Sequence, residues 1–375
     1  MDLPKVADIV IIGAGISGLS VALPIAKAGL SVAVLDKNEP WSDASGANAG
    51  TLSIQVKRAE VLSLIYESIE RWKRMPEDYG IEVGFGQPGG IRVATTEAEY
   101  NQLEKSVEVQ KNKGIDVRML NREAVRQLGP WLGPNVMAGS LCLYDSYSNP
   151  LVAGNAMVAG ARKLGGVIAG GNRVSEIRRN AMSDIDRFSI KTVSGDIIHA
   201  SHVVNAAGAW AGEISSMLGV KLPMEVDVNM LTVTEPSPPI FNRVVTHVGG
   251  ILSLKQLPNG TCLIGGGWQG RGSVSSGTKN IDYERFLHNM RVAADVIPKI
   301  RDLHILRTWA GFEAVAPDAL PIMGQLGEDD HVWTLGCARG GYSLAPALGA
   351  RLAEMILNPS KRDTLLQFSP QRFAP

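Results

Sequence analysis

Blocks of apolar residues separated by turns open the chain. An apolar run at 9–12 precedes a glycine-rich turn, a helical stretch to about Ala28, and a second apolar run at 31–35. Continuous apolar strands flanking a helix are typical of a parallel sheet that is covered on both faces. Pro24 lies inside the expected helix, where it removes one hydrogen bond and is predicted to cause a kink. The chain is therefore predicted to begin with a β–α–β unit.

The rest of the pattern alternates between two kinds of structure. Helices are predicted at 58–75, 97–113, 151–164 and 343–357, and short strands at 91–95, 140–144, 167–169, 173–178, 187–193, 197–206 and 332–335. Residues 222–310 are predicted to be mainly β, with glycine and proline turns. Pieces typical of a nucleotide-binding fold thus occur at the start, middle and end. We predict two interleaved α/β domains, one formed by 1–80, 148–220 and 308–375 and the other by 81–147 and 221–307.

Composition excludes several classes of protein. Lysine plus arginine and aspartate plus glutamate each total 37, so the formal net charge is zero and no nucleic-acid surface is expected. The three cysteines and six histidines show no spacing typical of a disulfide framework or a metal site. Residues 9–26 are uncharged, but glycines and Pro24 interrupt them, so no membrane span or targeting segment is predicted. We expect a soluble, cytoplasmic protein.

The glycines after the first strand indicate a dinucleotide site. Gly13, Gly15 and Gly18 form a Gly-x-Gly-x-x-Gly motif at the start of the first helix, and Asp36 ends the second strand. Glycines at this spacing allow backbone N–H groups to approach a pyrophosphate, and the acidic residue can accept hydrogen bonds from a ribose. The partial positive charge at the helix N-terminus also favours phosphate. This motif alone does not distinguish NAD from FAD.

Four stretches make the identification more specific. They are Ser-Gly-Ala-Asn-Ala-Gly-Thr at 45–51, VVNAAGAWA at 203–211, RTWAGFEAVAPDALPIMG at 307–324 and GCARGGYSLAP at 336–346. Together with the glycine motif, they resemble the D-amino-acid-oxidase superfamily of FAD-dependent amine oxidases and dehydrogenases. The resemblance implies an FAD-binding Rossmann-like domain of the glutathione-reductase type, interleaved with a substrate domain that is mainly an antiparallel β-sheet. Within the superfamily, the chain is most similar to the FAD subunits of heteromeric opine, hydroxyproline and proline dehydrogenases and of hydrogen cyanide synthase.

The resemblance also implies which residues bind FAD. Small residues at 45–51 would allow the backbone to approach the flavin ring, and the last helix would direct its N-terminus at the flavin, where the helix dipole favours the reduced anion. The predicted cofactor residues are Gly13, Gly15, Ile16, Ser17, Gly18, Asp36, Lys37, Ser45, Asn48, Ala49, Gly50, Thr51, Val174, Ala206, Ala207, Gly208, Trp210, Gly311, Arg339, Gly340, Gly341, Tyr342 and Ser343.

Two arginines are the predicted substrate anchors. Arg307 and Arg339 match positions where glycine oxidase has arginines beside the substrate, and a guanidinium binds a carboxylate through two hydrogen bonds. Glycine oxidase has a tyrosine at the position of Ser253 and a methionine near Trp268, so these two residues are predicted to shape a pocket for a different substrate. His247 is more consistent with a structural role.

The resemblance implies hydride transfer from an amine to FAD, for which the cofactor supplies the chemistry. The predicted substrate is a secondary amino acid, an opine or an imino acid. Electrons would then pass to a larger partner subunit, through an FMN at a subunit interface or an iron–sulfur centre, because this chain has too few spaced cysteines for a cluster. Two alternatives stay open: a stand-alone glycine- or sarcosine-type oxidase that uses oxygen, and a non-catalytic subunit that only holds FAD.

Overall fold

A parallel β-sheet forms the first of two structural layers. The computed structural model describes residues 3–180, 186–336, 340–361 and 365–373. The sheet has the strand order β19-β20-β11-β1-β2-β8, and β19 alone along this path runs antiparallel to its neighbour. A hairpin of β9 and β10 extends it from β11. Its strands are β1 (Val6–Ile12), β2 (Val32–Leu35), β8 (Val167–Ala169), β9 (Val174–Arg179), β10 (Phe188–Thr192), β11 (Ile197–Asn205), β19 (Ile322–Gln325) and β20 (Val332–Gly336).

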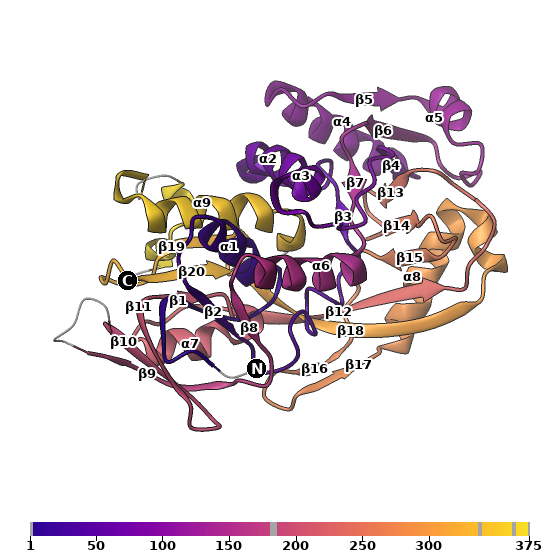
Figure 1. Ribbon diagram of the computed structural model, residues 1–375. Helices are drawn as coiled ribbons and strands as arrows, with labels where there is room; N and C mark the ends of the chain where they lie inside the picture. Colours follow the sequence, from indigo (N-terminus) through magenta and orange to yellow (C-terminus); the bar gives the residue numbers. More distant parts are fainter. Residues whose placement is uncertain (1–2, 181–185, 337–339, 362–364, 374–375) are drawn as a thin grey trace.

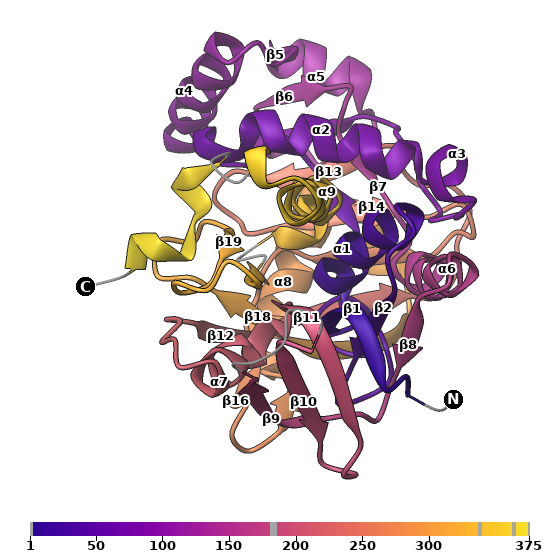
Figure 2. The ribbon, with the colours of Figure 1, turned by 60° about the vertical axis from the view of Figure 1, so that its left-hand side comes forward.

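Helices cover this sheet (Figure 2). The helices α1 (Ile16–Lys27), α6 (Pro150–Lys163) and α9 (Ala345–Leu357) pack on one face together with α2 (Leu62–Lys73), and α7 (Ala211–Met217) packs on the other. Pro24 lies inside α1 as predicted. The axes of α1 and α9 approach closely, because a Cβ added at Gly349 would lie 2.5 Å from the backbone of Ser20. This contact fixes the start of α9 relative to the glycine turn before α1.

A second, mainly antiparallel sheet lies beside the first. Its order is β18-β12-β15-β14-β13-β4-β6-β5, and only the pair of β13 and β4 is parallel. Its strands are β4 (Gly90–Ala94), β5 (Val117–Leu120), β6 (Ala138–Cys142), β12 (Glu225–Thr234), β13 (Val244–His247), β14 (Ser253–Gln256), β15 (Cys262–Gly265) and β18 (Ile305–Val315). The predicted fold class is therefore confirmed. The residue limits of the two domains stay a prediction.

The longest of the helices that were not predicted is α8 (Tyr283–Val296); the shorter α3 (Met75–Tyr79) and α5 (Arg122–Leu128) were also missed. Residues 283–296 belong to the stretch predicted to be mainly β, but they form α8. The side chain of Asp282 accepts a hydrogen bond from the backbone N–H of Arg285 and so caps the helix. The capping signal was visible in the sequence, but the surrounding strand pattern obscured it. By contrast, α4 (Glu97–Asn112) follows Thr96 with a capping box and matches its prediction closely.

The two sheets meet along the long strands β12 and β18 (Figure 1). The end of β18 contacts the turn that follows β11, where the rings of Phe312 and Trp210 lie 5.8 Å apart in an edge-to-face arrangement. A short ladder of β3 (Thr51–Leu52) and β7 (Ser146–Tyr147) forms a further connection. None of the helices in the described parts of the chain is long and apolar enough to cross a membrane.

Candidate functional site

An elongated pocket begins at the carboxyl ends of β1, β2 and β11. Gly13, Gly15, Asp36 and Ala206 line it near these strand ends. Ligands of doubly wound sheets bind at this edge of the sheet. The pocket is thus where the glycine motif predicts a dinucleotide.

The glycines are required by close packing. A Cβ added at Gly13 would lie 2.3 Å from the carbonyl oxygen of Ala206, and one at Gly18 would lie 1.9 Å from the carbonyl oxygen of Gly13. Gly13 also has a φ of +108°, a conformation that favours glycine. A Cβ at Gly15 would lie 2.9 Å from the hydroxyl of Ser45. The cradle therefore fits a ligand that approaches the backbone, as a pyrophosphate does.

Side chains stabilise the turn between β1 and α1. Asp36 accepts hydrogen bonds from the backbone N–H groups of Ala14 (2.8 Å) and Asn38 (2.9 Å), while Ser45 accepts one from Ile16 (2.9 Å). Burial raises the pKa of the Asp36 carboxyl, and these backbone hydrogen bonds oppose the rise. Asp36 therefore positions the turn and also presents a carboxylate to the pocket.

Part of the pocket lining is aromatic and cationic. The ammonium of Lys37 lies 3.0 Å from the centre of the Trp210 ring, and both residues line the pocket. Burial lowers the pKa of this ammonium, although the nearby carboxylates of Asp43 and Asp36 oppose the effect. Val174 also lines the pocket. A flat ring of the kind found in a nucleotide can pack against such a surface.

Most of the predicted cofactor residues line this pocket or the cavity that adjoins it. Three of them lie behind the lining: Gly18 packs against Gly13, a Cβ at Gly50 would meet the Ser148 carbonyl, and Ser343 donates its hydroxyl hydrogen bond to Gly340. Arg339 lies outside the described residues. The lining residues are Gly13, Gly15, Ile16, Ser17, Asp36, Lys37, Ser45, Asn48, Val174, Ala206, Ala207, Gly208, Trp210, Gly341 and Tyr342 in the pocket and Asn48, Ala49, Thr51, Gly311 and Gly340 in the cavity.

The adjoining cavity has a volume of about 550 Å³ and lies against the second sheet. Ala44, Asn48 and Glu313 line both spaces, so the pocket opens into the cavity at these residues. The cavity runs across strands β18, β12, β14, β13 and β4 and is covered by the segment 53–58. A ligand in the pocket could therefore present a reactive end to a second molecule in the cavity.

A hydrogen-bonded chain of three side chains borders the cavity. The hydroxyl of Ser253 lies 2.9 Å from that of Thr51, and the ammonium of Lys255 donates to Thr51 at 2.8 Å. Lys255 is fully buried, and burial lowers its pKa to about 7. Among the described residues, no carboxylate forms an ion pair with it. This lysine was not predicted, although a charged residue among Leu252, Leu254 and Leu257 was a visible signal.

Arg92 is a second cation that sequence analysis missed. It lines the cavity from β4, and its Nη1 donates to the Gln55 carbonyl at 3.0 Å. Its buried Nε has no hydrogen-bond partner within the described part of the chain, and neither has the buried Oγ1 of Thr246, its direct neighbour on β13. Burial lowers the pKa of this guanidinium, which nevertheless stays charged at neutral pH. Two adjacent residues of the wall therefore carry unsatisfied polar atoms.

Arg307 lies away from both the pocket and the cavity. This residue is exposed on β18, with its guanidinium 5.9 Å from the Trp309 ring, and it is not among the described residues that line the pocket or the cavity. The residue of β18 at the cavity is Glu313, which accepts a hydrogen bond from the Gly340 N–H at 3.0 Å. Six residues of strand separate the two, a distance of about 20 Å. Spacing along the sequence did not reveal where β18 enters the site.

The other predicted substrate residues differ in placement. Ser253 lines the cavity. Trp268 lies behind the lining, where its indole N–H donates to the Ile251 carbonyl at 2.7 Å. His247, for which a structural role was predicted, also lines the cavity; its Nδ1 accepts hydrogen bonds from the N–H groups of Gly249 and Gly250, so it stabilises a turn. Burial lowers the pKa of this imidazole, which favours the neutral form.

We predict that Gly15→Val prevents cofactor binding. The added side chain would occupy the space beside Ser45, where the backbone must approach a pyrophosphate. The ratio of visible flavin absorbance to protein absorbance in the purified variant should fall close to zero, while far-ultraviolet circular dichroism stays as in the wild type. A folded variant with a full complement of flavin would contradict this placement.

We predict that Lys255→Met stabilises the protein most at low pH. Because the folded state holds Lys255 with a pKa near 7 rather than 10.5, the unfolded state binds more protons between these values. Burial of the lysine therefore costs stability below pH 7, and this cost disappears as the pH rises toward 10.5. The thermal midpoint of the variant should exceed that of the wild type by more at pH 6 than at pH 9.5. The exposed Lys113→Met serves as control, and a gain that does not depend on pH would refute the prediction.

Comparison with curated proteins reveals relatives that match nearly all of the chain. Human mitochondrial dimethylglycine dehydrogenase is 26% identical over 387 residues, which is 98% of this chain but 44% of that protein. The chain thus spans less than half of the length of this relative. An opine oxidase subunit of Rhizobium meliloti is 27% identical over 380 residues, and the match covers 98% of this chain and 97% of the relative.

Solved structures and a family profile agree with this result. The crystal structure of L-proline dehydrogenase from P. horikoshii superposes with a TM-score of 0.89 at 28% identity, covering 99% of this chain and 98% of that one. The family described as FAD dependent oxidoreductase (DAO) matches residues 8–355. The glycine cradle and the adjoining cavity are consistent with such a cofactor and its substrate. This chain belongs to the DAO family of FAD-dependent oxidoreductases.

Proposed function

We propose that the protein oxidises the C–N bond of a secondary amino acid, an opine or a related imino acid. FAD, when bound, accepts the hydride from the carbon beside the amine nitrogen. The imine product then reacts with water to give a carbonyl compound and an amine. The chain's own residues bind the carboxylate, orient the amine and surround the reacting atoms.

The observation that carries this proposal is the guanidinium of Arg92, which lines the cavity beside Thr246 and forms no ion pair with a described carboxylate. A guanidinium without a carboxylate partner in a cavity wall favours an anionic ligand. A carboxylate suits both residues, since it accepts from the guanidinium and from the hydroxyl. We therefore assign Arg92 the anchoring role expected of Arg307.

The register of the sheet supports this assignment. Arg92 pairs with Thr246, and Thr246 pairs with Ser253, so the three residues form a row across β4, β13 and β14. Neighbouring strands lie about 4.8 Å apart. A carboxylate at Arg92 would leave the rest of a small amino acid above Thr246 and Ser253. Ser253 bonds to Thr51, one of the predicted cofactor residues.

The relatives support the same substrate class. Their names refer to an opine, to dimethylglycine and to L-proline, all of which are amino acids with a substituted nitrogen. Hydride transfer requires the amine in its neutral form, and no separate nucleophile is needed. The hydrogen-bonded side chains of Ser253, Thr51 and Lys255 supply polar contacts next to the reacting region, and none of these three side chains carries a negative charge.

We predict that Arg92→Met lowers kcat/KM for an amino-acid substrate about 30- to 1000-fold, which corresponds to about 2–4 kcal/mol. Arg92→Lys should retain an intermediate activity, because it keeps the charge but loses the planar pair of donors. Arg307→Met is the matched control and should behave as the wild type. Steady-state kinetics of flavin-loaded proteins test this. If kcat/KM fell equally in Arg92→Met and Arg307→Met, or fell only in Arg307→Met, the result would contradict the assignment of Arg92 and would favour Arg307 as the carboxylate anchor.

We further propose that electrons leave through a partner subunit. The support is the resemblance to the opine oxidase chain of Rhizobium meliloti, whose name identifies it as one subunit of a larger enzyme. The partner would hold an FMN or an iron–sulfur centre within reach of FAD. A stand-alone oxidase of the glycine or sarcosine type is the main alternative, and a scaffold subunit without catalysis is the other. A cytoplasmic location stays a prediction, supported by the small number of cysteines.

The choice of electron acceptor separates these possibilities. After anaerobic reduction by substrate, the flavin of the isolated chain should be reoxidised faster by a dye than by air-saturated buffer, and co-expression with the partner should accelerate turnover. Rapid peroxide formation by a monodisperse monomer with full turnover would favour the stand-alone oxidase. A flavin that no amine reduces, even in the complex, would favour the scaffold.

A further inference from the structure

A second open space adjoins the cavity on the side away from the cofactor pocket. It is a groove of about 490 Å³ between the segment 55–62 and helix α4. Its lining consists of Gln55, Val56, Lys57, Arg58, Ala59, Leu62, Arg92, Ala98, Asn101, Gln102, Lys105, Ser106, Val109 and Gln110. The function proposed above makes no use of this space.

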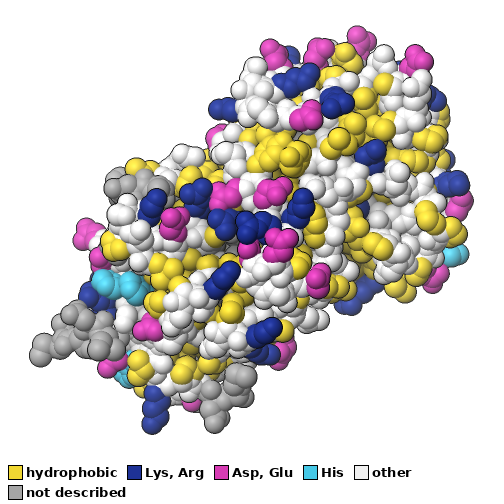
Figure 3. Space-filling model, turned by 45° about the horizontal axis from the view of Figure 1, so that its top comes forward, with side chains coloured by type: hydrophobic (Ala, Val, Ile, Leu, Met, Phe, Trp, Pro, Cys, Tyr) yellow, Lys and Arg dark blue, Asp and Glu magenta, His cyan; other side chains and the backbone are white. Residues whose placement is uncertain are grey.

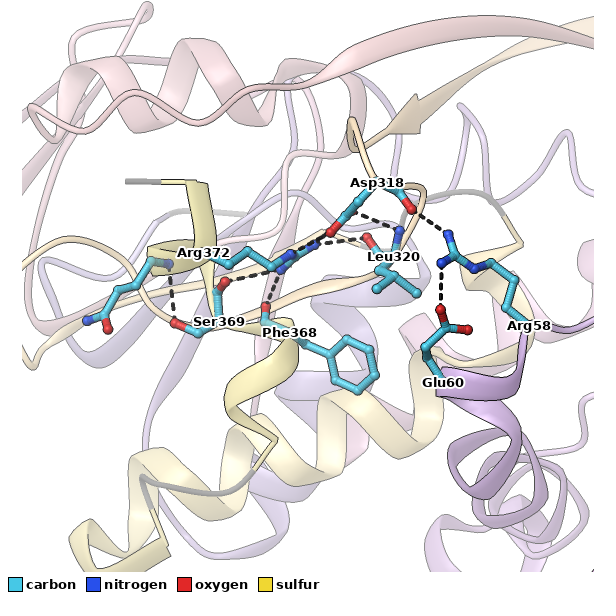
Figure 4. A network of polar contacts seen from close by, with 8 residues as sticks. Arg58, Glu60, Asp318, Leu320, Phe368, Ser369 and Arg372 are labelled. Atoms are coloured by element: carbon cyan, nitrogen blue, oxygen red, sulfur yellow. Dashed lines mark hydrogen bonds and ion pairs between the residues drawn. The ribbon is translucent and has the colours of Figure 1, made fainter. Parts of the chain in front are cut away.

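The groove is cationic. Lys57, Arg58, Arg92 and Lys105 line it, and none of the described lining residues is acidic. Arg58 is partly neutralised, because it forms an ion pair with Glu60 and also donates to the carbonyl of Asp318 (Figure 4). On the face that Figure 3 shows, lysine and arginine side chains lie among aspartate and glutamate. The groove lining, by contrast, contains no acidic residue among those that the structure describes.

The groove continues into the cavity. Val56, Lys57, Arg58 and Arg92 line both spaces. Arg92 stands at the boundary, since it is the one of these four that lies on the second sheet. A molecule whose carboxylate is bound by Arg92 could therefore extend a second group along the groove toward Lys105.

The walls of the groove are held together by one carbonyl group. The oxygen of Gln55 accepts hydrogen bonds from Nη1 of Arg92 at 3.0 Å and from Nε2 of Gln110, on α4, at 2.9 Å. The Gln55 side chain is itself buried and donates to the Gly90 carbonyl and to Asp145. The positions of Arg92 and α4 are thus set before a ligand arrives, which reduces the entropic cost of binding.

We propose that this groove is a subsite for a second anionic group on the substrate's nitrogen substituent. The inference rests on the proposed function and narrows its substrate class to amino acids whose N-substituent ends in a carboxylate or another anion. Lys105 attracts this second group, while Asn101, Gln102 and Ser106 offer hydrogen bonds. Amines with an uncharged N-substituent of the same length are poorer substrates.

Three synthetic amines test the subsite on the flavin-loaded enzyme. N-(3-carboxypropyl)glycine and N-butylglycine differ only at the end of the substituent, and N-(3-phosphonopropyl)glycine carries a phosphonate there. The wild type should have a higher kcat/KM for the two anionic amines than for N-butylglycine, mainly through a lower KM. Preference for the carboxylate identifies a dicarboxylic amine, and preference for the phosphonate identifies a phosphorylated one.

Variants at the exposed Lys105 connect this selectivity to the groove. Lys105→Gln should reduce the ratio of kcat/KM for the anionic amines to kcat/KM for N-butylglycine about three- to tenfold, and Lys105→Glu should reduce this ratio further. The kcat/KM for N-butylglycine itself should not change. Lys111→Gln, on the same helix but outside the groove, should leave the preference intact. Equal kcat/KM for all three amines, or a preference that Lys105→Glu does not reduce, would overturn the subsite while leaving the proposed function in place.

Binding without turnover separates the two hypotheses. Thioether analogues, with sulfur in place of the amine nitrogen, cannot be oxidised at a C–N bond but keep both ends of the molecule. The analogue with two carboxylates should raise the thermal midpoint of the wild type more than the analogue with one, and Lys105→Glu should abolish the difference. This result would support the subsite even if no amine were oxidised. An equal shift by the two analogues would refute it.

Discussion

A fully buried carboxylate, Asp145, holds the segment on which both the cavity and the groove depend. It accepts hydrogen bonds from the Ser53 hydroxyl (2.7 Å), the Ile54 N–H (2.7 Å) and the Gln55 amide (2.9 Å). Burial raises the pKa of Asp145, and these donors oppose the rise. Because a charge in this environment requires every one of its partners, residues 53–55 have little freedom to move. Their position in turn determines where Arg92 and the end of α4 lie.

The site lies at the seam between two sheets that share no strand. The parallel sheet supplies the backbone cradle for the cofactor, and the second sheet forms one wall of the adjoining cavity. β18 links them, since its end carries Gly311 and Glu313 to the place where pocket and cavity join.

The cations near the seam differ in how they are stabilised. Arg58 has a carboxylate partner, whereas the buried Lys255 and the half-buried Arg92 form no ion pair among the described residues. Such groups lower the stability of the folded protein unless a ligand compensates for the lost hydration. Arg92 borders the substrate cavity and Lys255 bonds to a predicted cofactor residue. A ligand bound beside these two cations could therefore offset the loss of folding stability that their burial causes.

The sequence by itself determined the features that depend on neighbouring residues. The β–α–β unit with its glycines and Asp36, the helix after Thr96 and the identity of the family all follow from short stretches of chain. Local hydrogen bonds and backbone sterics decide these features. The tertiary structure decided the rest of the candidate site. Arg92 meets Thr246 across 154 positions of sequence and Lys255 meets Thr51 across 204, through strand pairing and a contact between domains. Arg307 has the residue type expected of a carboxylate anchor, yet the length of β18 carries it away from the cavity. The alternation of apolar and polar residues along a strand indicates which face of the strand a side chain occupies. It does not indicate which part of that face other elements cover, so only long-range packing determines which charged side chains share a cavity.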